Sequence, residues 1–332
     1  MSTVGRASTG RLAAADVAIA AQLACLLEAS APKPGNVSPG RNFADLGYEE
    51  FLASAAAIGA PLAGAGTRPL GSTVRLAIDA TARWTRTNSN LGIVLLLAPL
   101  ARAALIEGSL ALDVTVDGGQ STFRDTLQRV LEATTVEDAR EVYEAIRLAA
   151  PGGLGTVDDQ DVAQEPTGTL LDVMRLAAER DLVAREYGTT FELTFLTGVP
   201  ALRRARRDGL SWDDASVEAF LTLLAAAADT HIARRGGAAM AAAVSRQACA
   251  ALAAGGVRTA RGREAIQRMD QGLRDPRHLA NPGTAADLTA AAIFVVLLGG
   301  GWWRAPDALE GQGRAQDAES GGVAGGRDAA SR

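Results

Sequence analysis

Residues 87–107 read TNSNLGIVLLLAPLARAALIE and contain one of the two longest apolar runs of the chain, at 91–97. Asn88, Ser89 and Asn90 stand directly before this run, and asparagine and serine are side chains that cap helix N-termini. The stretch therefore predicts a strongly apolar helix over 90–107. The other run, at 290–298, is also well short of the roughly 20 apolar residues that cross a bilayer. We expect both segments in the core of a protein without a membrane span.

Helical periodicity and helix-capping signals recur along most of the chain, whereas strand-like alternation is almost absent. The sequence predicts an all-α fold, a single multi-helix globular domain with about twelve helices. Three helix starts have capping-box spacing with aspartate in the last position, at Thr135/Asp138, Ser211/Asp214 and Thr284/Asp287. The expected helices are 11–30, 48–66, 71–86, 90–107, 120–133, 136–149, 168–184, 189–206, 213–234, 237–254, 260–274 and 284–299.

The ends of the chain differ in composition from its body. Residues 305–332 are rich in glycine, alanine and charge, which is typical of a disordered tail. Residues 1–10 are expected to be flexible, which leaves 11–304 as the all-α domain that carries any catalytic site. Residues 150–164, APGGLGTVDDQDVAQ, form the longest irregular stretch of the body. Either a mobile loop over a site or a solvated turn accounts for it.

Charge and cysteine content restrict the function classes. The formal net charge is −5 and no block of basic residues occurs, which argues against sequence-independent binding to nucleic acid or an anionic membrane. Cys25 and Cys249 have no metal-binding spacing and are interpreted as buried thiols of a reducing compartment. We expect a cytoplasmic protein. The alanine-rich helix 237–254 would allow close packing across a homodimer.

Lys33 is the only lysine of the chain and stands in Lys33-Pro34-Gly35-Asn36. Pro34 favours an extended Lys33, and Gly35 permits a turn or close approach of a ligand. A stiff loop would then present the ammonium to a ligand; an ordinary helix-to-helix turn with an exposed lysine is the alternative. Residues 87–92 allow a similar choice, because the start of a helix can seat a phosphate or simply be capped.

Two further polar stretches lie near the C-terminus. Asp229, within an alanine-rich predicted helix, needs a partner or a ligand, and His231 is one of two histidines. The structural alternative places Asp229 on a solvated face, with Arg235 complementing a helix end and glycines 236–237 capping it. In residues 281–287, NPGTAAD, helix capping is the stronger interpretation. Each stretch alone predicts no more than a helical domain.

Taken together and in this order, the stretches resemble the CitG/MdcB family, the triphosphoribosyl-dephospho-CoA synthases. The family's lysine-proline-glycine stretch matches 33–35, and its aspartate and Phe-x-x-Ser helix match Asp45 and 51–54. Further matches are the Asn-rich segment at 88–92, Asp-Thr at 229–230 with Arg-Gly-Gly at 235–237, and Pro-Gly to Asp-Leu at 282–288. The resemblance covers roughly residues 11–300.

The resemblance implies transfer of the triphosphoribosyl unit of ATP to 3′-dephospho-CoA, with release of adenine. Such a substitution at the anomeric carbon needs a carboxylate to accept the proton of the attacking hydroxyl. It also needs cations for the triphosphate, including Mg²⁺ held by carboxylates and phosphate oxygens. By this resemblance Asp229 and Asp45 are the candidates for catalysis and for metal binding. The candidates for substrate binding are Lys33, Asn36, Asn88, Asn90, His231 and Arg235.

Departures from the family pattern leave other functions open. Residues 88–92 read NSNLG, without the family's histidine and lysine, and 39–45 lack another family histidine. A lost cation at a triphosphate site needs compensation, for example from Arg41. One alternative is a related transferase with a different acceptor in one-carbon cofactor biosynthesis, of the methanopterin or methanofuran type, as in similar archaeal and methylotroph proteins. The other is a non-catalytic helical partner protein.

Overall fold

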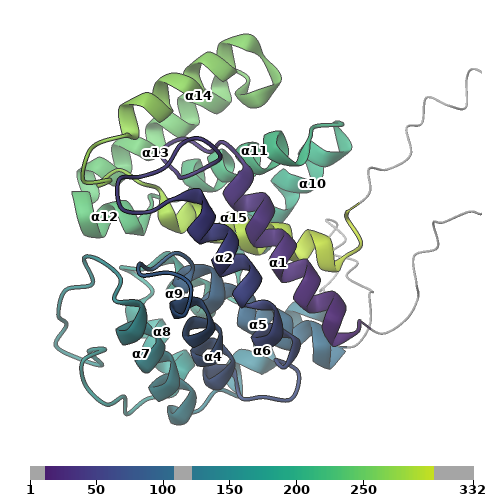
Figure 1. The fold of residues 1–332 in the computed structure, drawn as a ribbon, viewed down its shortest axis with the longest axis vertical. Helices are drawn as coiled ribbons and strands as arrows, with labels where there is room; N and C mark the ends of the chain where they lie inside the picture. Colours follow the sequence, from purple (N-terminus) through teal and green to yellow (C-terminus); the bar gives the residue numbers. More distant parts are fainter. Residues whose placement is uncertain (1–11, 108–121, 303–332) are drawn as a thin grey trace, which may run out of the picture. The chain divides into compact units, whose positions relative to one another are not determined.

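The computed structural model describes residues 12–107 and 122–302, and these are organised as helices without a strand ladder (Figure 1). Within the described residues there are fifteen α-helices, one π-helical segment and one 3₁₀ segment. The all-α prediction is confirmed, with a somewhat larger number of helices than expected. The predicted flexible segment 1–10 and tail 305–332 lie outside the described residues. No described helix combines the length and hydropathy of a membrane span.

Most helices of the first half of the described chain pack against α5. Their bounds are α1 (Ala14–Ser30), α2 (Tyr48–Ala57), α3 (Gly59–Ala63), α4 (Leu70–Ala82), α5 (Leu91–Glu107), α6 (Thr122–Glu132), α7 (Val136–Ala149), α8 (Leu170–Ala177) and α9 (Leu182–Gly188). As the sequence predicts, α5 is apolar all round, and Leu96, Leu97 and Leu100 are fully buried.

The second half begins with the π-helical segment η1 (Thr194–Gly198) and ends with a long apolar helix. Its other elements are α10 (Val199–Arg207), α11 (Trp212–Ala226), α12 (Thr230–Gly236), α13 (Ala238–Ala253), η2 (Gly256–Arg258), α14 (Ala260–Leu273) and α15 (Gly283–Leu298). Helix α15 packs against α1, α5 and α11, and Figure 1 shows α1 crossing in front of it. Because α15 contacts helices from both halves, it anchors the hydrophobic core.

A second hydrophobic cluster lies among α11, α12, α13 and α14. Phe220, Leu221 and Leu224 of α11 pack there with Ile232 of α12. Within this chain α13 contacts α11, α12 and α14, and its role in a homodimer stays a prediction. Of the two cysteines, Cys25 is buried as expected but Cys249 is exposed, so that part of the interpretation is wrong.

The capping predictions have different outcomes. At α7 the capping box is present, since the Asp138 amide donates to Thr135 Oγ1 (3.1 Å) and the Thr135 amide to Asp138 Oδ2 (2.9 Å). The predicted box of Thr284 and Asp287 is wrong, because α15 already begins at Gly283 and the Thr284 hydroxyl accepts the amide of His231 instead (3.1 Å). Asp287 is thereby free for another role.

The predicted helix 213–234 is also wrong, because the chain breaks into α11 and α12. Ala227 is extended at the end of α11, and Asp229 is the N-cap of α12. Aspartate followed by threonine is a typical helix start, since these side chains accept hydrogen bonds from the first free amides. The surrounding alanine run concealed this signal in the sequence.

Candidate active site

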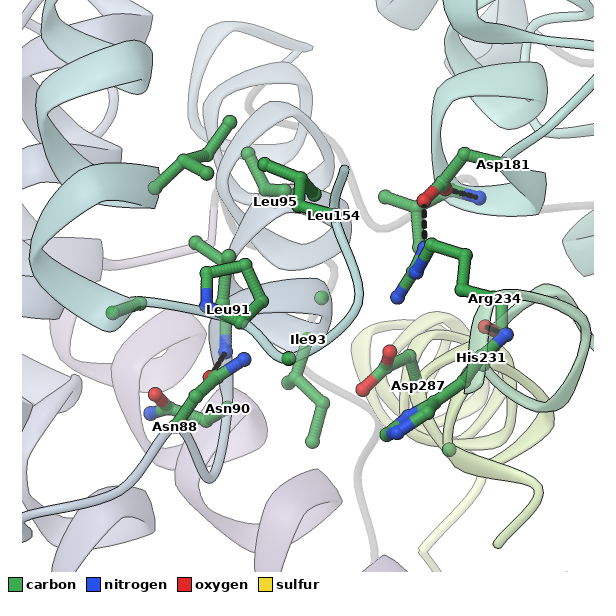
Figure 2. Close-up of a pocket in the computed structure, with 18 of the residues that line it drawn as sticks. Asn88, Asn90, Leu91, Ile93, Leu95, Leu154, Asp181, His231, Arg234 and Asp287 are labelled. Carbon is green, nitrogen blue, oxygen red and sulfur yellow. Dashed lines mark hydrogen bonds and ion pairs between the residues drawn. The ribbon is translucent and has the colours of Figure 1, made fainter. Parts of the chain in front are cut away.

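A cavity of about 640 Å³ opens between segments that are far apart in the sequence. Its wall includes the end of α1, the loop before α2, the start of α5, the irregular segment after α7, and residues of α12 and α15. Figure 2 shows His231, Arg234 and Asp287 on one side and Asn88, Asn90 and Leu91 across from them. A cavity of this size accommodates a nucleotide-sized ligand.

Asp287 is the carboxylate that projects into the middle of this cavity (Figure 2). It lies against Gly92 in the first turn of α5, where a Cβ atom at position 92 would collide with the carboxyl group. Burial, followed by the negative charges of Glu28, Asp229 and Asp181, raises the pKa of Asp287 well above its ordinary value. A carboxyl group whose proton affinity is raised by its surroundings is suited to proton transfer.

Lys33 lies behind the cavity wall and not on it. Its Nζ is 2.9 Å from Glu28 Oε1 and also donates to the backbone oxygens of Glu28 and Ala31, with no exposure of the side chain. Glu28, by contrast, lines the cavity. The geometry therefore favours Lys33 as a group that holds Glu28 in place, in contrast to the substrate contact expected from the sequence.

Asp229 is likewise buried behind the wall. Oδ1 accepts the amide of Ile232 (3.0 Å) and Oδ2 accepts the amide of Ala285 (2.8 Å), so one carboxylate joins the starts of α12 and α15. Burial raises the pKa of Asp229 to about 6. Since both oxygens bind backbone amides and the side chain does not line the cavity, this geometry favours positioning of α15 over the catalytic and metal-binding roles expected from the sequence.

Three basic side chains of α12 line the cavity. Arg234 forms an ion pair with Asp181, which also caps α9 (Figure 2). Arg235 donates to the backbone oxygen of Arg277 (2.8 Å) and approaches His231 Nε2 (3.4 Å). Burial, with the two arginine charges, lowers the pKa of His231 to about 4, so its imidazole is neutral at pH 7. Of these residues, sequence reasoning selected His231 and Arg235.

The two asparagines before α5 line the opposite side of the cavity. Asn88 Oδ1 accepts the amide of Leu91 (3.0 Å) and caps the helix, while Asn90 Nδ2 donates to Thr81 Oγ1 (3.0 Å) from a buried position. Both also satisfy the structural alternative of ordinary capping and packing. Their contact with a substrate stays a prediction.

The remaining candidates also line the cavity. The Asp45 side chain is 75% exposed, and its Oδ1 lies 3.8 Å from His278 Nε2. Asn36 is 6% exposed and donates from Nδ2 to Asn281 Oδ1 (2.6 Å). Of the eight candidates in the sequence analysis, the structure brings six to one cavity and places Lys33 and Asp229 just behind its wall.

Four further residues line the cavity although the sequence analysis does not name them as site residues: Glu28, Asp181, Arg234 and Asp287. Glu28 lies in the apolar pattern of α1 and carries no local signal. Arg234 resembles a residue that complements a helix end, and Asp287 had the spacing of a cap. Only Asp287 had a usable signal, since it lies in one of the stretches that match the family.

Comparisons with known proteins identify the family of the chain. A family model described as "CitG: ATP:dephospho-CoA triphosphoribosyl transferase" matches residues 14–305. The chain belongs to the CitG family. The resemblance drawn from the short motifs of the sequence is therefore confirmed over most of the chain.

Individual relatives are similar over parts of their lengths. A probable 2-(5''-triphosphoribosyl)-3'-dephosphocoenzyme-A synthase of Pseudomonas putida is 33% identical over 57% of this chain and 66% of its own length. The synthase of Klebsiella pneumoniae is 36% identical over 29% of this chain and 34% of its own. The chain thus matches less than two thirds of each relative's own length. A crystal structure of a proposed triphosphoribosyl-dephospho-CoA synthase from Archaeoglobus fulgidus superposes with a TM-score of 0.56 at 28% identity, covering 76% of this chain and all of that one.

Proposed function

We propose that this protein transfers the triphosphoribosyl group of ATP to a ribose hydroxyl of 3′-dephospho-CoA and releases adenine. The observation that carries the proposal is the meeting of the Asp287 carboxyl group with the guanidinium groups of Arg234 and Arg235 on one cavity. Membership of the CitG family supports the same reaction.

Asp287 is the proposed general base. In the reaction a bond forms between the acceptor hydroxyl oxygen and C1′ of the ATP ribose, while the bond from C1′ to adenine N9 breaks. The hydroxyl proton passes to Asp287, the departing adenine takes up one proton from water, and Asp287 is restored when it releases its own proton to water. The raised pKa of Asp287 makes it a stronger base than an ordinary carboxylate, which favours its role in taking the hydroxyl proton. Its negative charge also stabilises the oxocarbenium character that develops at C1′.

Arginines hold the triphosphate in this proposal. Arg234 and Arg235 line the cavity from α12, and Arg86 and Arg180 line it from other segments. Guanidinium groups form paired hydrogen bonds to phosphate oxygens, and they offset the loss of the family's lysine at position 91. The ion pair with Asp181 fixes the direction of Arg234 before a ligand arrives.

We also propose that Mg²⁺ enters with ATP. The described residues contain no group of three or more His, Cys, Asp or Glu side chains arranged to hold a metal ion. Mg²⁺ brought by a nucleotide needs only one or two protein carboxylates, because phosphate oxygens and water complete its shell. Glu28 fits this donor set, since it lines the cavity and its charge interacts with that of Asp287, which is kept for proton transfer. Bound there, Mg²⁺ would neutralise charge on the triphosphate.

The test is an adenine-release assay. The purified chain is incubated with ATP, Mg²⁺ and 3′-dephospho-CoA, and adenine and the coupled product are followed by chromatography and mass spectrometry. We expect equal amounts of both products, and loss of both when either substrate is omitted. Binding of Mg-ATP without adenine release in the presence of 3′-dephospho-CoA would contradict this acceptor and leave the nucleotide site standing.

A further inference from the structure

Asn36 carries a buried acceptor without a partner. The side chain is 6% exposed and lines the cavity, and its Nδ2 donates to Asn281 Oδ1. Among the described residues, Asn36 Oδ1 accepts no hydrogen bond. Buried polar atoms are nearly always paired, because an unpaired acceptor loses its hydration without compensation. The atom therefore points to a hydrogen-bond donor supplied by a ligand.

The loop that carries Asn36 is held rigidly. Gly35 adopts a left-handed φ of 77°, which glycine allows without strain, and its amide donates to Asp270 Oδ1 (2.8 Å). Arg274 donates to the backbone oxygen of Asn36 (2.8 Å) and also pairs with Asp270 (3.0 Å). Since these contacts fix the backbone on both sides, the Asn36 amide is presented in one position.

His278 is a second group on the same cavity, with Asp45 Oδ1 3.8 Å from its Nε2, beyond hydrogen-bond distance. Both ring nitrogens are buried and make no hydrogen bond among the described residues, and the ring stacks on Phe43 with centroids 3.9 Å apart. The residue has a φ of 52°, a conformation that few side chains adopt. Asp275 stabilises this turn by accepting the amides of Arg277 and Leu279, each at 2.8 Å. Strain of this kind is characteristic of binding sites.

The two groups together select a chemical class of ligand. Asn36 Oδ1 requires an N–H or O–H donor, and the imidazole nitrogens of His278 can donate or accept. A phosphate supplies only acceptors and would leave Asn36 Oδ1 unpaired. The edge of adenine carries an amino group beside a ring nitrogen, which is the pattern that asparagine amides pair with.

We propose that Asn36 and His278 bind the amino edge of an adenine ring, with Asn36 Oδ1 accepting from the exocyclic amino group. The assignment rests on the proposed function, in which both ATP and 3′-dephospho-CoA carry adenine. The arginines of the same cavity then bind phosphates, so that base and phosphates occupy different parts of the wall.

Equilibrium binding tests the proposal without turnover. Wild-type protein is titrated calorimetrically with ATP and with inosine triphosphate, in which an oxygen replaces the amino group, and likewise with 3′-dephospho-CoA and its inosine counterpart. We expect the amino form of one pair to bind roughly tenfold tighter, since the oxo form leaves an acceptor facing an acceptor. The pair that shows this preference identifies the source of the adenine.

Variants connect the preference to the named residues. We expect Asn36→Leu to abolish the preference for the amino form of the ligand. Asn36→Asp, which keeps an acceptor, should retain this preference. Asn42→Leu is the matched control, because Asn42 is exposed, bonds the Tyr48 amide and does not line the cavity. If Asn36→Leu does not fold, His278→Asn replaces it, since asparagine tolerates a positive φ, and the preference should fall there too.

Two results overturn the assignment. One is a wild-type protein that binds both forms of each pair equally, and the other is a preference that survives in Asn36→Leu and in His278→Asn. Failure of the proposed function is separate: a preference that depends on Asn36, without adenine release in the assay above, removes the reaction and leaves the adenine site. Adenine release together with a preference that is independent of Asn36 supports the reaction and removes the adenine site.

Discussion

Asp287 and Asp229 are close in space and chemically alike, but their contacts differ. Asp229 gives both oxygens to backbone amides, whereas Asp287 lines the cavity against α5. We expect Asp287→Asn to lower the rate of adenine release by roughly 100- to 10,000-fold, as for loss of a general base. Its thermal midpoint should stay the same or rise, because repulsion from Glu28 disappears.

Asp229→Asn is the matched comparison. The new amide group faces the Ala285 amide with a donor in place of an acceptor, which costs about 1–3 kcal/mol of unfolding free energy. The rate per folded molecule should remain within a few-fold of wild type. Chemical denaturation combined with active-site titration measures both quantities. A reversed outcome, with Asp229 needed for chemistry and Asp287 dispensable, would contradict the assignment of roles.

We expect the buried Lys33–Glu28 pair to be tolerated only when both charges are present. Lys33→Met leaves the Glu28 charge buried and unpaired, which destabilises the protein by about 3–5 kcal/mol. The double variant with Glu28→Gln should recover most of this loss, since neither charge is then buried. Urea unfolding of the two single variants and the double variant gives the coupling energy. Simple additivity would show that the two groups act independently.

His231 should make stability dependent on pH. Its pKa falls from 6.5 to about 4 on folding, so the unfolded chain binds a proton more readily between these values. This contribution to stability is complete above pH 6.5 and is lost as pH falls toward 4. Between pH 7.5 and 5.0 we expect wild type to lose roughly 2 kcal/mol more than His231→Asn. Urea titrations at the two pH values provide the measurement, and equal losses would refute the shift.

At the scale of elements, the contact between α5 and α15 depends on a glycine. Any side chain at Gly92 collides with the Asp287 carboxyl group, so Gly92→Ala should displace Asp287 and reduce adenine release at least tenfold. The matched control is Gly272→Ala in α14, where a Cβ atom meets nothing within 4 Å. That variant should gain about 0.5–1 kcal/mol of stability and keep full activity. Activity assays with thermal unfolding compare the two, and an active Gly92→Ala would contradict the contact.

The sequence predicted elements where the local signal and the packing agree. The sequence predicts helix α5 because capping residues precede an apolar run. It predicts the capping box at α7 because Thr135 and Asp138 have the spacing at which each side chain accepts the other residue's amide. The break between α11 and α12 was missed, since an alanine run on both sides outweighs a single cap. The turn at Thr190 and Phe191, with φ of 52° and 61°, was also missed. Tertiary contacts stabilise it, including the bond from the Arg124 guanidinium to the Thr190 oxygen (2.9 Å).

At the scale of the whole molecule, the order of motifs predicted which segments meet but not what each side chain does. Motifs around Lys33 and Asp229 do lie beside the cavity, but these two side chains stabilise its wall from behind. The distinction depends on burial and on which backbone amides need a partner, and neither is visible in a single sequence. Glu28 and Asp181 were missed for the same reason.

The irregular segment after α7 contributes residues to the cavity wall, and Asp161 stabilises it. Its carboxylate accepts the amides of Val157 and Ala163, each at 2.8 Å, and these bonds lower its pKa. We expect Asp161→Ala to weaken Mg-ATP binding by roughly tenfold through loss of this order, with little change in the maximal rate. Steady-state kinetics provides the test: the Michaelis constant for ATP should rise while the turnover number stays nearly the same. An unchanged constant would mean that this segment does not contribute to binding.

The bond between the Gly35 amide and Asp270 joins positions 235 residues apart. During synthesis, the first loop leaves the ribosome long before α14 exists, so nothing can hold its turn in the nascent chain. Catalytic competence must therefore arise late, after nearly the whole polypeptide has emerged. Until then the apolar α5 has no α15 to cover it, so the incomplete chain exposes hydrophobic surface that favours aggregation.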